Sequence, residues 1–261
     1  KKKKGSNLIY FGPGVHNLPN DTLFVPSGTT VYIDGGARVY GNIFTEGAHD
    51  VNIFGRGEVH PDGRGAGVWV RRSKNVRIDG IVVSQLPIGQ CDSVELTNVK
   101  SISYYGWGDG MDVFSSSNVI LDGVFCRNSD DCAAVYASTQ GFKGGSNNVL
   151  VKNATLWADV AHPINIGGHG DPNGMDTVQN VTFRNIDILD QAEKQIDYQG
   201  CLAINPGDNT LVRNITFENI RIEDFRNGQL VNFRISFNPK YCVSTGRGIQ
   251  NVLVKDVTYN G

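Results

Sequence analysis

The amino-acid sequence predicts an all-β protein, and within that class a parallel β-helix, from three observations. Glycine accounts for 32 of the 261 residues, well above ordinary usage. Short segments of alternating apolar residues recur, each starting at an asparagine followed by Val or Ile, and no 3.6-residue helical pattern competes with them. The repeat interval of about two dozen residues or more is typical of stacked repeat proteins. The recurring asparagines are Asn52, Asn75, Asn98, Asn118, Asn148, Asn180, Asn214 and Asn251.

The elements follow from these repeats in chain order. The first coils are predicted in the stretch GTTVYIDGGARVYGNIF, from Gly28 to Phe44, where two strands alternate apolar and polar residues. From residue 52 to residue 118 the asparagines are 20 to 23 residues apart, which predicts short turns. Beyond residue 118 the spacing grows to between 30 and 37 residues, so we expect inserted loops at residues 139–147, 167–178 and 189–199. Such loops on a rigid scaffold often form the walls of binding sites.

The apolar positions of the repeats are mainly valine, isoleucine and phenylalanine, which favour strands. Leucine-rich repeats of similar length would instead be dominated by leucine. Successive coils of a β-helix lie about 4.8 Å apart, so equivalent residues form ladders along the axis. We expect the recurring asparagines to form one such ladder, hydrogen-bonded to each other and to the turn backbone.

Length and composition predict one soluble-type domain over residues 1–261, with residues 1–6 interpreted as a disordered or foreign extension that carries the basic run KKKK. The net charge of −2 argues against a nucleic-acid partner, and the absence of a long apolar segment argues against membrane insertion. The five cysteines form no CxxC pair, so the sequence predicts no metal site.

Three segments near the middle of the chain align on their turn-to-strand junctions. They are DGMDVFSS from Asp109, DCAAVYAS from Asp131 and HPINIGGH from His162. Because their apolar positions coincide, we expect Asp109, Asp131 and His162 in one ladder, each about 4.8 Å from the next, with Asp130 beside them. The coinciding positions are Met111, Ala133 and Ile164 in one column and Val113, Val135 and Ile166 in the next.

A group of aspartates on one surface predicts acid–base chemistry. Close like charges raise the pKa of at least one carboxyl group, and a protonated carboxyl near a carboxylate is what glycosidic cleavage requires. One group protonates the departing sugar oxygen and the other prepares a water, with no metal or organic cofactor. Aspartate in either motif alone is commonly a turn residue, but turn residues have no reason to fall in register on adjacent coils.

Aromatic and histidine side chains near the aspartates indicate a sugar-binding groove. Trp107 precedes Asp109, and Tyr198 lies in a late insertion. Sugar rings pack their C–H faces on aromatic planes, so these residues are predicted subsites. His169, in the segment GGHG, either reaches the cleft or belongs to a tight turn, and Trp157 either lines the groove or fills the coil interior.

The strings WGDGMDVFSSSNV, NSDDCAAVYA and AHPINIGGHG resemble three signature segments of the polygalacturonase family of glycoside hydrolases, and the likeness spans roughly residues 8 to 259. The resemblance implies a right-handed parallel β-helix, a pectin-lyase-like solenoid, that cleaves pectic polymers with inversion of configuration. It implies that Asp130 is the general acid and that Asp109 and Asp131 hold and deprotonate the water. His162 would tune the acid or bind substrate, and a secreted or periplasmic location is expected.

One departure concerns the substrate. Pectinases of this family carry an Arg-Ile-Lys motif whose cations bind the uronate carboxylate, and the matching string here is FRISF. Arg234 is kept as a predicted substrate-binding residue, Ser236 replaces the lysine, and Lys240 is a nearby substitute cation. The opening YFGPGVHNLP and the string TTVYIDGGARVYG also resemble dextranases and isopullulanases, which act on neutral α-glucans, although their N-terminal β-sandwich is missing.

Two further functions remain as alternatives to hydrolysis. A polysaccharide lyase on the same fold would use calcium and a basic proton acceptor, and its unsaturated product would absorb ultraviolet light. A non-catalytic carbohydrate-binding β-helix would bind a polysaccharide, with no hydrolysis detectable in the unmodified protein. For the hydrolase we expect an activity optimum on the acid side of neutrality, because the general acid must keep its proton.

Overall fold

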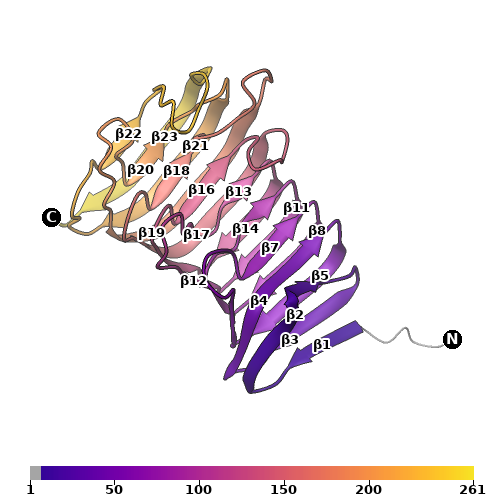
Figure 1. Ribbon diagram of the computed structural model, residues 1–261. Coiled ribbons are helices and arrows are strands. Elements are labelled where there is room, and N and C mark those ends of the chain that lie inside the picture. Colours follow the sequence, from indigo (N-terminus) through magenta and orange to yellow (C-terminus); the bar gives the residue numbers. More distant parts are fainter. Residues whose placement is uncertain (1–6) are drawn as a thin grey trace.

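The computed structural model describes residues 7–261, which form a right-handed parallel β-helix of 23 strands with no helix among them. Figure 1 shows the coils stacked from β1 at one end to β22 and β23 at the other. Every pairing between the named strands is parallel. The predicted fold class is therefore confirmed. Residues 1–6, predicted to be an extension, lie outside the described residues.

Three parallel sheets run along the axis. The first sheet stacks β1 (Asn7–Phe11), β3 (Thr29–Ile33), β5 (His49–Gly55), β8 (Lys74–Asp79), β11 (Asp92–Thr97), β14 (Ser117–Asp122), β17 (Ser146–Ala158), β19 (Thr177–Asp190), β21 (Leu211–Ile222) and β23 (Gly248–Tyr259). The second sheet contains β2 (Gly14–Phe24), β4 (Ala37–Glu46), β6 (Glu58–His60), β9 (Val82–Val83), β12 (Lys100–Ile102) and β15 (Phe125–Asn128), and continues in the second halves of β17, β19, β21 and β23.

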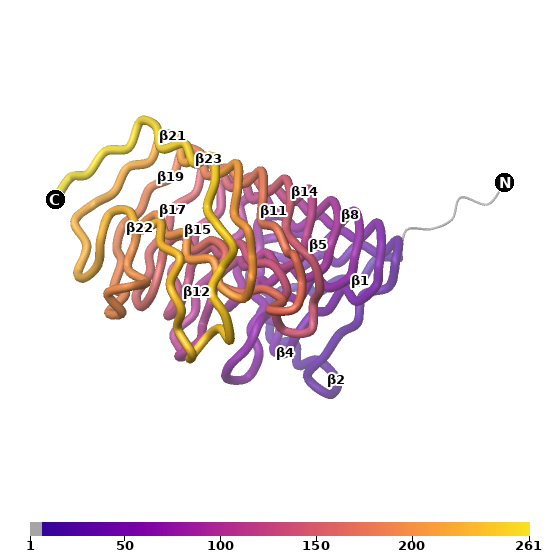
Figure 2. Tube along the Cα trace, turned by 90° about the horizontal axis from the view of Figure 1, so that it is seen from above, coloured from indigo at the N-terminus to yellow at the C-terminus, as the bar shows by residue number. Residues whose placement is uncertain are grey.

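The third sheet carries the residues of interest for function. It begins in the second halves of β2 and β4 and continues through β7 (Val68–Arg71), β10 (Ile88–Gly89), β13 (Val113–Phe114), β16 (Ala133–Tyr136), β18 (Ile164–Ile166), β20 (Leu202–Ile204) and β22 (Val231–Phe233). Figure 2 shows the same coils from above, each lying on the one before it.

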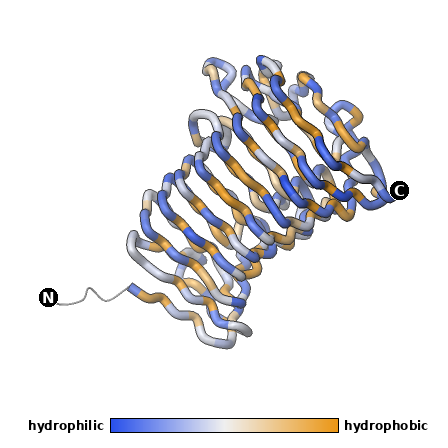
Figure 3. Tube along the Cα trace, turned by 180° about the vertical axis from the view of Figure 1, so that it is seen from behind, coloured by the Kyte–Doolittle hydropathy of each residue, from blue (hydrophilic) through white to orange (hydrophobic). Residues whose placement is uncertain are grey.

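Strand alternation explains the core. The pairings Val113↔Val135 and Ala133↔Ile164 confirm both apolar columns expected from the sequence, and these side chains are almost completely buried. Inward residues fill the coil, and the residues between them point outward. Figure 3 shows the resulting alternation of hydrophobic and hydrophilic residues along the strands. Within residues 7–261 no helix is present that could cross a membrane.

The asparagine ladder exists, but it is divided in two. Asn118 accepts a hydrogen bond from Asn148 at 2.7 Å, and both adopt positive φ angles of 56°. Asn and Asp tolerate this left-handed conformation because their short polar side chains bond locally. Two predicted members are wrong: Asp50 takes the place of Asn52 and accepts from Asn75 at 3.0 Å, whereas Asn98 belongs to a second bend. That second bend contains Asn98, Asn153, Asn185 and Asn219.

The predicted insertions at residues 139–147, 167–178 and 189–199 overlap the connections that follow β16, β18 and β19, although residues 146–147, 177–178 and 189–190 belong to strands. A further long connection, residues 234–247 between β22 and β23, was not predicted. All four connections leave or approach the third sheet. They therefore form walls beside the coils that carry the aspartates.

Candidate active site

The three aligned segments meet at the start of successive strands of the third sheet. Asp109 precedes β13, Asp131 precedes β16 and His162 precedes β18. The backbone N–H of Gly110 donates to the carbonyl of Asp131 at 2.7 Å, and that of Cys132 donates to the carbonyl of His162 at 2.8 Å. Asp109, Asp131 and His162 are thus in one ladder, as the sequence alignment predicted.

Asp131 and His162 form a buried pair. The Nδ1 atom of His162 lies 2.7 Å from Oδ1 of Asp131, and the backbone N–H of His162 donates to the same oxygen at 3.0 Å. The Nε2 atom of His162 faces the carbonyl oxygen of Tyr198. Because both ring nitrogens face acceptors, the imidazole donates from both and carries a positive charge. Burial alone would lower the pKa of His162, but the charge and hydrogen bond of Asp131 outweigh it and raise the pKa to about 9.

The second carboxylate oxygen of Asp131, Oδ2, also accepts two hydrogen bonds. The hydroxyl of Tyr136 donates to Oδ2 at 2.6 Å, and Nδ2 of Asn165 donates to it at 2.9 Å. Burial raises the pKa of Asp131, but the charge of His162 and the hydrogen bonds from His162, Tyr136 and Asn165 lower it to about 2. Asp131 is therefore an anion throughout the pH range in which the protein would work.

The pKa values of Asp130 and Asp109 shift in the opposite direction, above the usual value. Burial and the negative charge of Asp131 raise the pKa of Asp130 to about 7, although the backbone N–H of Asp131 donates to its Oδ1 at 3.1 Å. Burial and the charges of Asp130 and Asp131 raise the pKa of Asp109 well above its usual value. The cluster therefore sets a protonated carboxyl group beside a permanent carboxylate, which is the separation of roles that acid–base catalysis needs.

Asp112 is a fourth carboxyl group that the sequence reading did not single out. It is 3% exposed, and burial followed by the charges of Asp109 and Asp131 raises its pKa well above the usual value. The alternation of the string DGMDVF carries the signal. Met111 and Val113 point into the coil, so Asp112 points outward on the same surface as the other carboxyl groups.

A cavity of about 450 Å³ lies over this cluster, within the range typical of ligand sites. The four carboxyl groups and His162 line it. Of the predicted substrate-binding residues, Trp107, His169 and Tyr198 also line it, together with aromatic and polar side chains that were not predicted. The latter include Trp69, Phe114, Tyr136, Asn165, Glu193, Gln195 and Tyr241.

The predicted aromatic and histidine residues differ in their exposure and in their contacts. Trp107 is 59% exposed, and Nζ of Lys240 lies 5.1 Å from the centre of its ring. Tyr198 is buried, packs on Tyr241 with ring centres 5.8 Å apart, and contacts His162 through its carbonyl oxygen. His169 meets the ring of Tyr136 edge-on at 5.0 Å.

Two sequence-predicted residues lie away from the cavity. Arg234 donates to the carboxylate of Asp197, and it is not among the described residues that line the cavity. Trp157 neither fills the coil nor lines the groove. It points outward from β17, and the guanidinium of Arg127 lies 4.2 Å above its ring.

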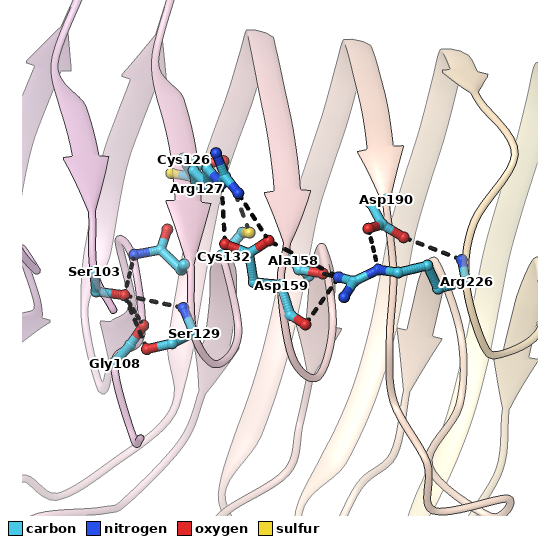
Figure 4. Close-up of polar contacts among 11 residues, drawn as sticks. Ser103, Gly108, Cys126, Arg127, Ser129, Cys132, Ala158, Asp159, Asp190 and Arg226 are labelled. Carbon is cyan, nitrogen blue, oxygen red and sulfur yellow. Dashed lines mark hydrogen bonds and ion pairs between the residues drawn. The ribbon is translucent and has the colours of Figure 1, made fainter. Parts of the chain in front are cut away.

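The turn before His162 is held by a neighbouring arginine. Nη2 of Arg226 donates to the carbonyl oxygens of Ala158 and Asp159 at 3.3 and 2.9 Å, while its Nε donates to Asp190 at 2.5 Å (Figure 4). Arg127 pairs with the side chain of Asp159 at 3.0 Å in the same view. These contacts fix the bend from which the chain enters β18, and with it the position of His162.

Comparison with known proteins identifies relatives. The profile of glycosyl hydrolases family 28 matches residues 66–261. A polygalacturonase from Juniperus ashei is 26% identical over 216 residues, which cover 79% of this chain and 39% of that protein. An exopolygalacturonase from Cochliobolus carbonum is 24% identical over 246 residues, covering 81% of this chain and 52% of that protein. The chain thus spans about half the length, or less, of these relatives.

Solved structures share the fold. The family 28 exopolygalacturonase of Yersinia enterocolitica superposes with a TM-score of 0.80 at 14% identity, covering 99% of this chain and 61% of that structure. The endo-xylogalacturonan hydrolase of Aspergillus tubingensis superposes with a TM-score of 0.58 at 13% identity, covering 97% of this chain and 85% of that structure. The family profile covers well over half of the sequence, and the chain therefore belongs to glycosyl hydrolases family 28.

Proposed function

We propose that this protein is a glycoside hydrolase that cleaves the glycosidic bonds of a pectic polysaccharide. The observation that carries the proposal is the pairing of Asp130, whose pKa is raised to about 7, with the ionised Asp131–His162 pair on one cavity wall. Family membership and the polygalacturonases among its relatives support the same activity.

The mechanism we propose is a single displacement at the anomeric carbon. Asp130, protonated below its pKa, donates its proton to the glycosidic oxygen as the bond to the anomeric carbon breaks. Asp109, in the fraction of the protein in which it is ionised, takes a proton from a water that attacks the same carbon from the opposite face, so the configuration inverts. The fixed negative charge of Asp131 keeps the proton on Asp130 until the leaving oxygen receives it.

The substrate proposed is rich in uronic acid. Arg64 lines the cavity, and Lys240 lies at the rim above Trp107, so cations are available to a uronate carboxylate although Ser236 replaces the family lysine. A polysaccharide of this kind is met outside the cytoplasm, which supports a secreted or periplasmic location.

A second candidate substrate is a neutral α-glucan. It is favoured by one observation, namely that the guanidinium of Arg234 is already paired with Asp197 and does not reach the cavity. A neutral sugar requires no cation at that position.

Product analysis separates these possibilities. The protein is incubated with polygalacturonate, rhamnogalacturonan, dextran and pullulan, and the products are read by mass spectrometry and by ultraviolet absorbance. We expect saturated oligosaccharides from polygalacturonate, with the inverted anomer seen first by proton NMR. Unsaturated products would indicate a lyase, products from dextran or pullulan alone would indicate the neutral substrate, and binding without products would indicate a non-catalytic β-helix.

A further inference from the structure

A second cavity, the side cavity, adjoins the main cavity that holds the aspartates. It has a volume of about 290 Å³ and lies at the connections from the second sheet to the third, lined by parts of residues 60–65, 84–85 and 103–108. Gly65 and Gln85 line both cavities, so the two are continuous at these residues. The proposed mechanism gives the side cavity no role.

Two exposed tyrosines form one wall of the side cavity. Tyr104 is 78% exposed and Tyr105 is 39% exposed, and their ring centres lie 4.2 Å apart at an interplanar angle of 34°. Tyr40, which pairs in register with His60 on the second sheet, also lines the cavity. Sugar rings pack their C–H faces on exposed aromatic side chains. The side cavity therefore has the aromatic surface that a carbohydrate site requires.

The loop that carries the two tyrosines is fixed by hydrogen bonds. Oγ of Ser103 donates to the carbonyl oxygen of Gly108 and accepts from the backbone N–H of Ser129 at 3.1 Å (Figure 4). Nδ2 of Asn128 also donates to Oγ of Ser103, at 3.0 Å. Oγ of Ser129 in turn donates to the carbonyl oxygen of Tyr105. Because this wall is formed before a ligand arrives, little free energy is lost in ordering it.

The charges around the side cavity disfavour an acidic sugar. The guanidinium of Arg38 is paired with Glu58, with Nη2 at 2.8 Å from Oε2. Burial lowers the pKa of His60, which keeps its imidazole neutral near pH 7. The carboxylate of Asp62 therefore gives the lining a net negative charge. A uronate is repelled by this charge, whereas the hydroxyl groups of a neutral sugar can donate to the carboxylate and bond to the imidazole.

The position of the side cavity suits a branch of a polymer. The main cavity follows the third sheet along the axis, from Trp69 on β7 to Asn165 on β18. The cations Arg64 and Lys240 lie beside that path. The side cavity opens from it toward the second sheet, where Tyr40 is located. A uronate backbone in the main cavity therefore passes the mouth of the side cavity.

We propose that the side cavity binds a neutral sugar that branches from the uronate backbone, so that the protein prefers a branched pectic polysaccharide. This proposal rests on the hydrolase function proposed above and narrows the class of its substrate. The ring of the branch packs on Tyr104 and Tyr105, and its hydroxyl groups bond to Asp62. Gln85 adds a further acceptor, because its Nε2 donates to the carbonyl oxygen of Trp107 at 3.3 Å and its amide oxygen can accept from a sugar hydroxyl.

Ligand binding tests the side cavity without any need for hydrolysis. Saturation-transfer difference NMR is recorded with the methyl glycosides of xylose, galactose and glucose. We expect at least one of these neutral probes to bind the unmodified protein, and its affinity to fall by about tenfold or more in the double variant Tyr104→Ala, Tyr105→Ala. Tyr10→Ala removes a tyrosine that is 55% exposed on β1 and is expected to keep the binding.

Kinetics on a matched pair of polymers test the preference. A galacturonan that carries xylose branches is compared with the same polymer after its branches have been removed. We expect kcat/KM to be higher by about tenfold on the branched polymer, mainly through a lower KM, because the branch binds equally before and during the reaction. The double variant should lose this preference, and Tyr10→Ala should keep it.

Further controls keep the outcomes distinct. Circular dichroism establishes that the double variant is folded, and Tyr104→Ala alone changes a single exposed residue and provides a second variant. The proposal would be overturned if no neutral probe bound, if both variants kept the binding of the unmodified protein, or if the unmodified protein cleaved the two polymers equally well. A protein that binds a neutral probe through these tyrosines but cleaves neither polymer would overturn the proposed hydrolase function and still support a sugar site in the side cavity.

Discussion

At the scale of single residues, the cavity places chemically identical side chains in different environments. Asp130 and Asp131 are adjacent in sequence, yet burial and a neighbouring anion raise the pKa of Asp130 to about 7, whereas His162 and two neutral donors lower that of Asp131 to about 2. The direction of each shift follows from which partners face each carboxyl group. The sequence shows that the two residues are adjacent, but it does not show which groups face each carboxyl group in the fold.

The first prediction at this scale concerns the pH dependence of activity. In the proposed mechanism Asp130 donates a proton, so kcat/KM should fall tenfold per pH unit once the pH exceeds the pKa of Asp130, at about 7. Hydrolysis rates measured from pH 3 to pH 10 check this expectation. A rate that continues to rise through pH 9 would contradict it.

The second prediction concerns stability. A carboxyl group with a raised pKa stabilises the fold below its unfolded value near 4, and this contribution is lost as the pH rises through the folded value of about 7. Asp130→Asn replaces the carboxyl group with an amide that cannot ionise, so no buried charge forms at this position at pH 8. The Tm of the variant at pH 8 should therefore exceed that of the unmodified protein. Asp131→Asn leaves the charge of His162 buried without its anion, and its Tm should fall by several degrees, in line with a cost of about 3–5 kcal/mol. Equal Tm values for both variants, measured by calorimetry, would argue against the assigned charge states.

At the scale of elements, each coil is closed by residues in the left-handed conformation, and ladders of hydrogen bonds tie these bends together. Asn118 illustrates both functions, with a φ of 56°, a hydrogen bond to Asp92 at 2.7 Å and another from Asn148 at 2.7 Å. The bends set the register of the strands that follow. They therefore determine which residues share a ladder on the third sheet.

The third prediction separates the two functions of this asparagine. Asn118→Gly keeps the backbone conformation but loses the hydrogen bonds, at a cost of about 1 kcal/mol. Asn118→Ala also places a Cβ in the left-handed region, so about 1–2 kcal/mol more should be lost. Urea denaturation measures both, with Asn173→Ala in an exposed loop as the control. Equal stability of the alanine and glycine variants would show that the conformation contributes nothing.

The fourth prediction concerns the turn before His162. Arg226→Met removes the donors that hold the carbonyl oxygens of Ala158 and Asp159, and the displaced histidine should lower kcat by about tenfold or more. Arg184→Met removes an arginine of similar exposure, which lies on β19 and pairs with Glu218 on β21. This change should leave kcat unchanged. Kinetic constants for the two variants provide the check, and identical kcat values would refute a role for Arg226.

How much was predictable from sequence depends on whether a residue lies on a strand or in a loop. The ladder of Asp109, Asp131 and His162 followed from apolar columns with a period of two, because register is transmitted along the coil. Asp112 was equally accessible to that reasoning and was overlooked. The ion pair of Arg234 with Asp197 was not accessible, because it depends on how two long connections fold over the third sheet.

At the scale of the whole molecule, a stack of similar coils brings together residues more than fifty positions apart. Asp109 and His162 share a cavity because they lie only two coils apart along the stack, and this spacing does not depend on the length of the loops between them. The scaffold tolerates long insertions after β16, β18, β19 and β22, and these insertions form the cavity walls. The stacked coils thus fix the acidic floor of the cavity, and the connections shape its walls.

The most direct test of this account compares the unmodified protein with its Asp130→Asn variant on polygalacturonate at pH 5, measured as the release of new reducing ends. The account predicts steady release by the unmodified protein and a loss of at least a thousandfold in a variant that remains folded. Equal release by the two proteins, or ends that carry an unsaturated sugar, would contradict it.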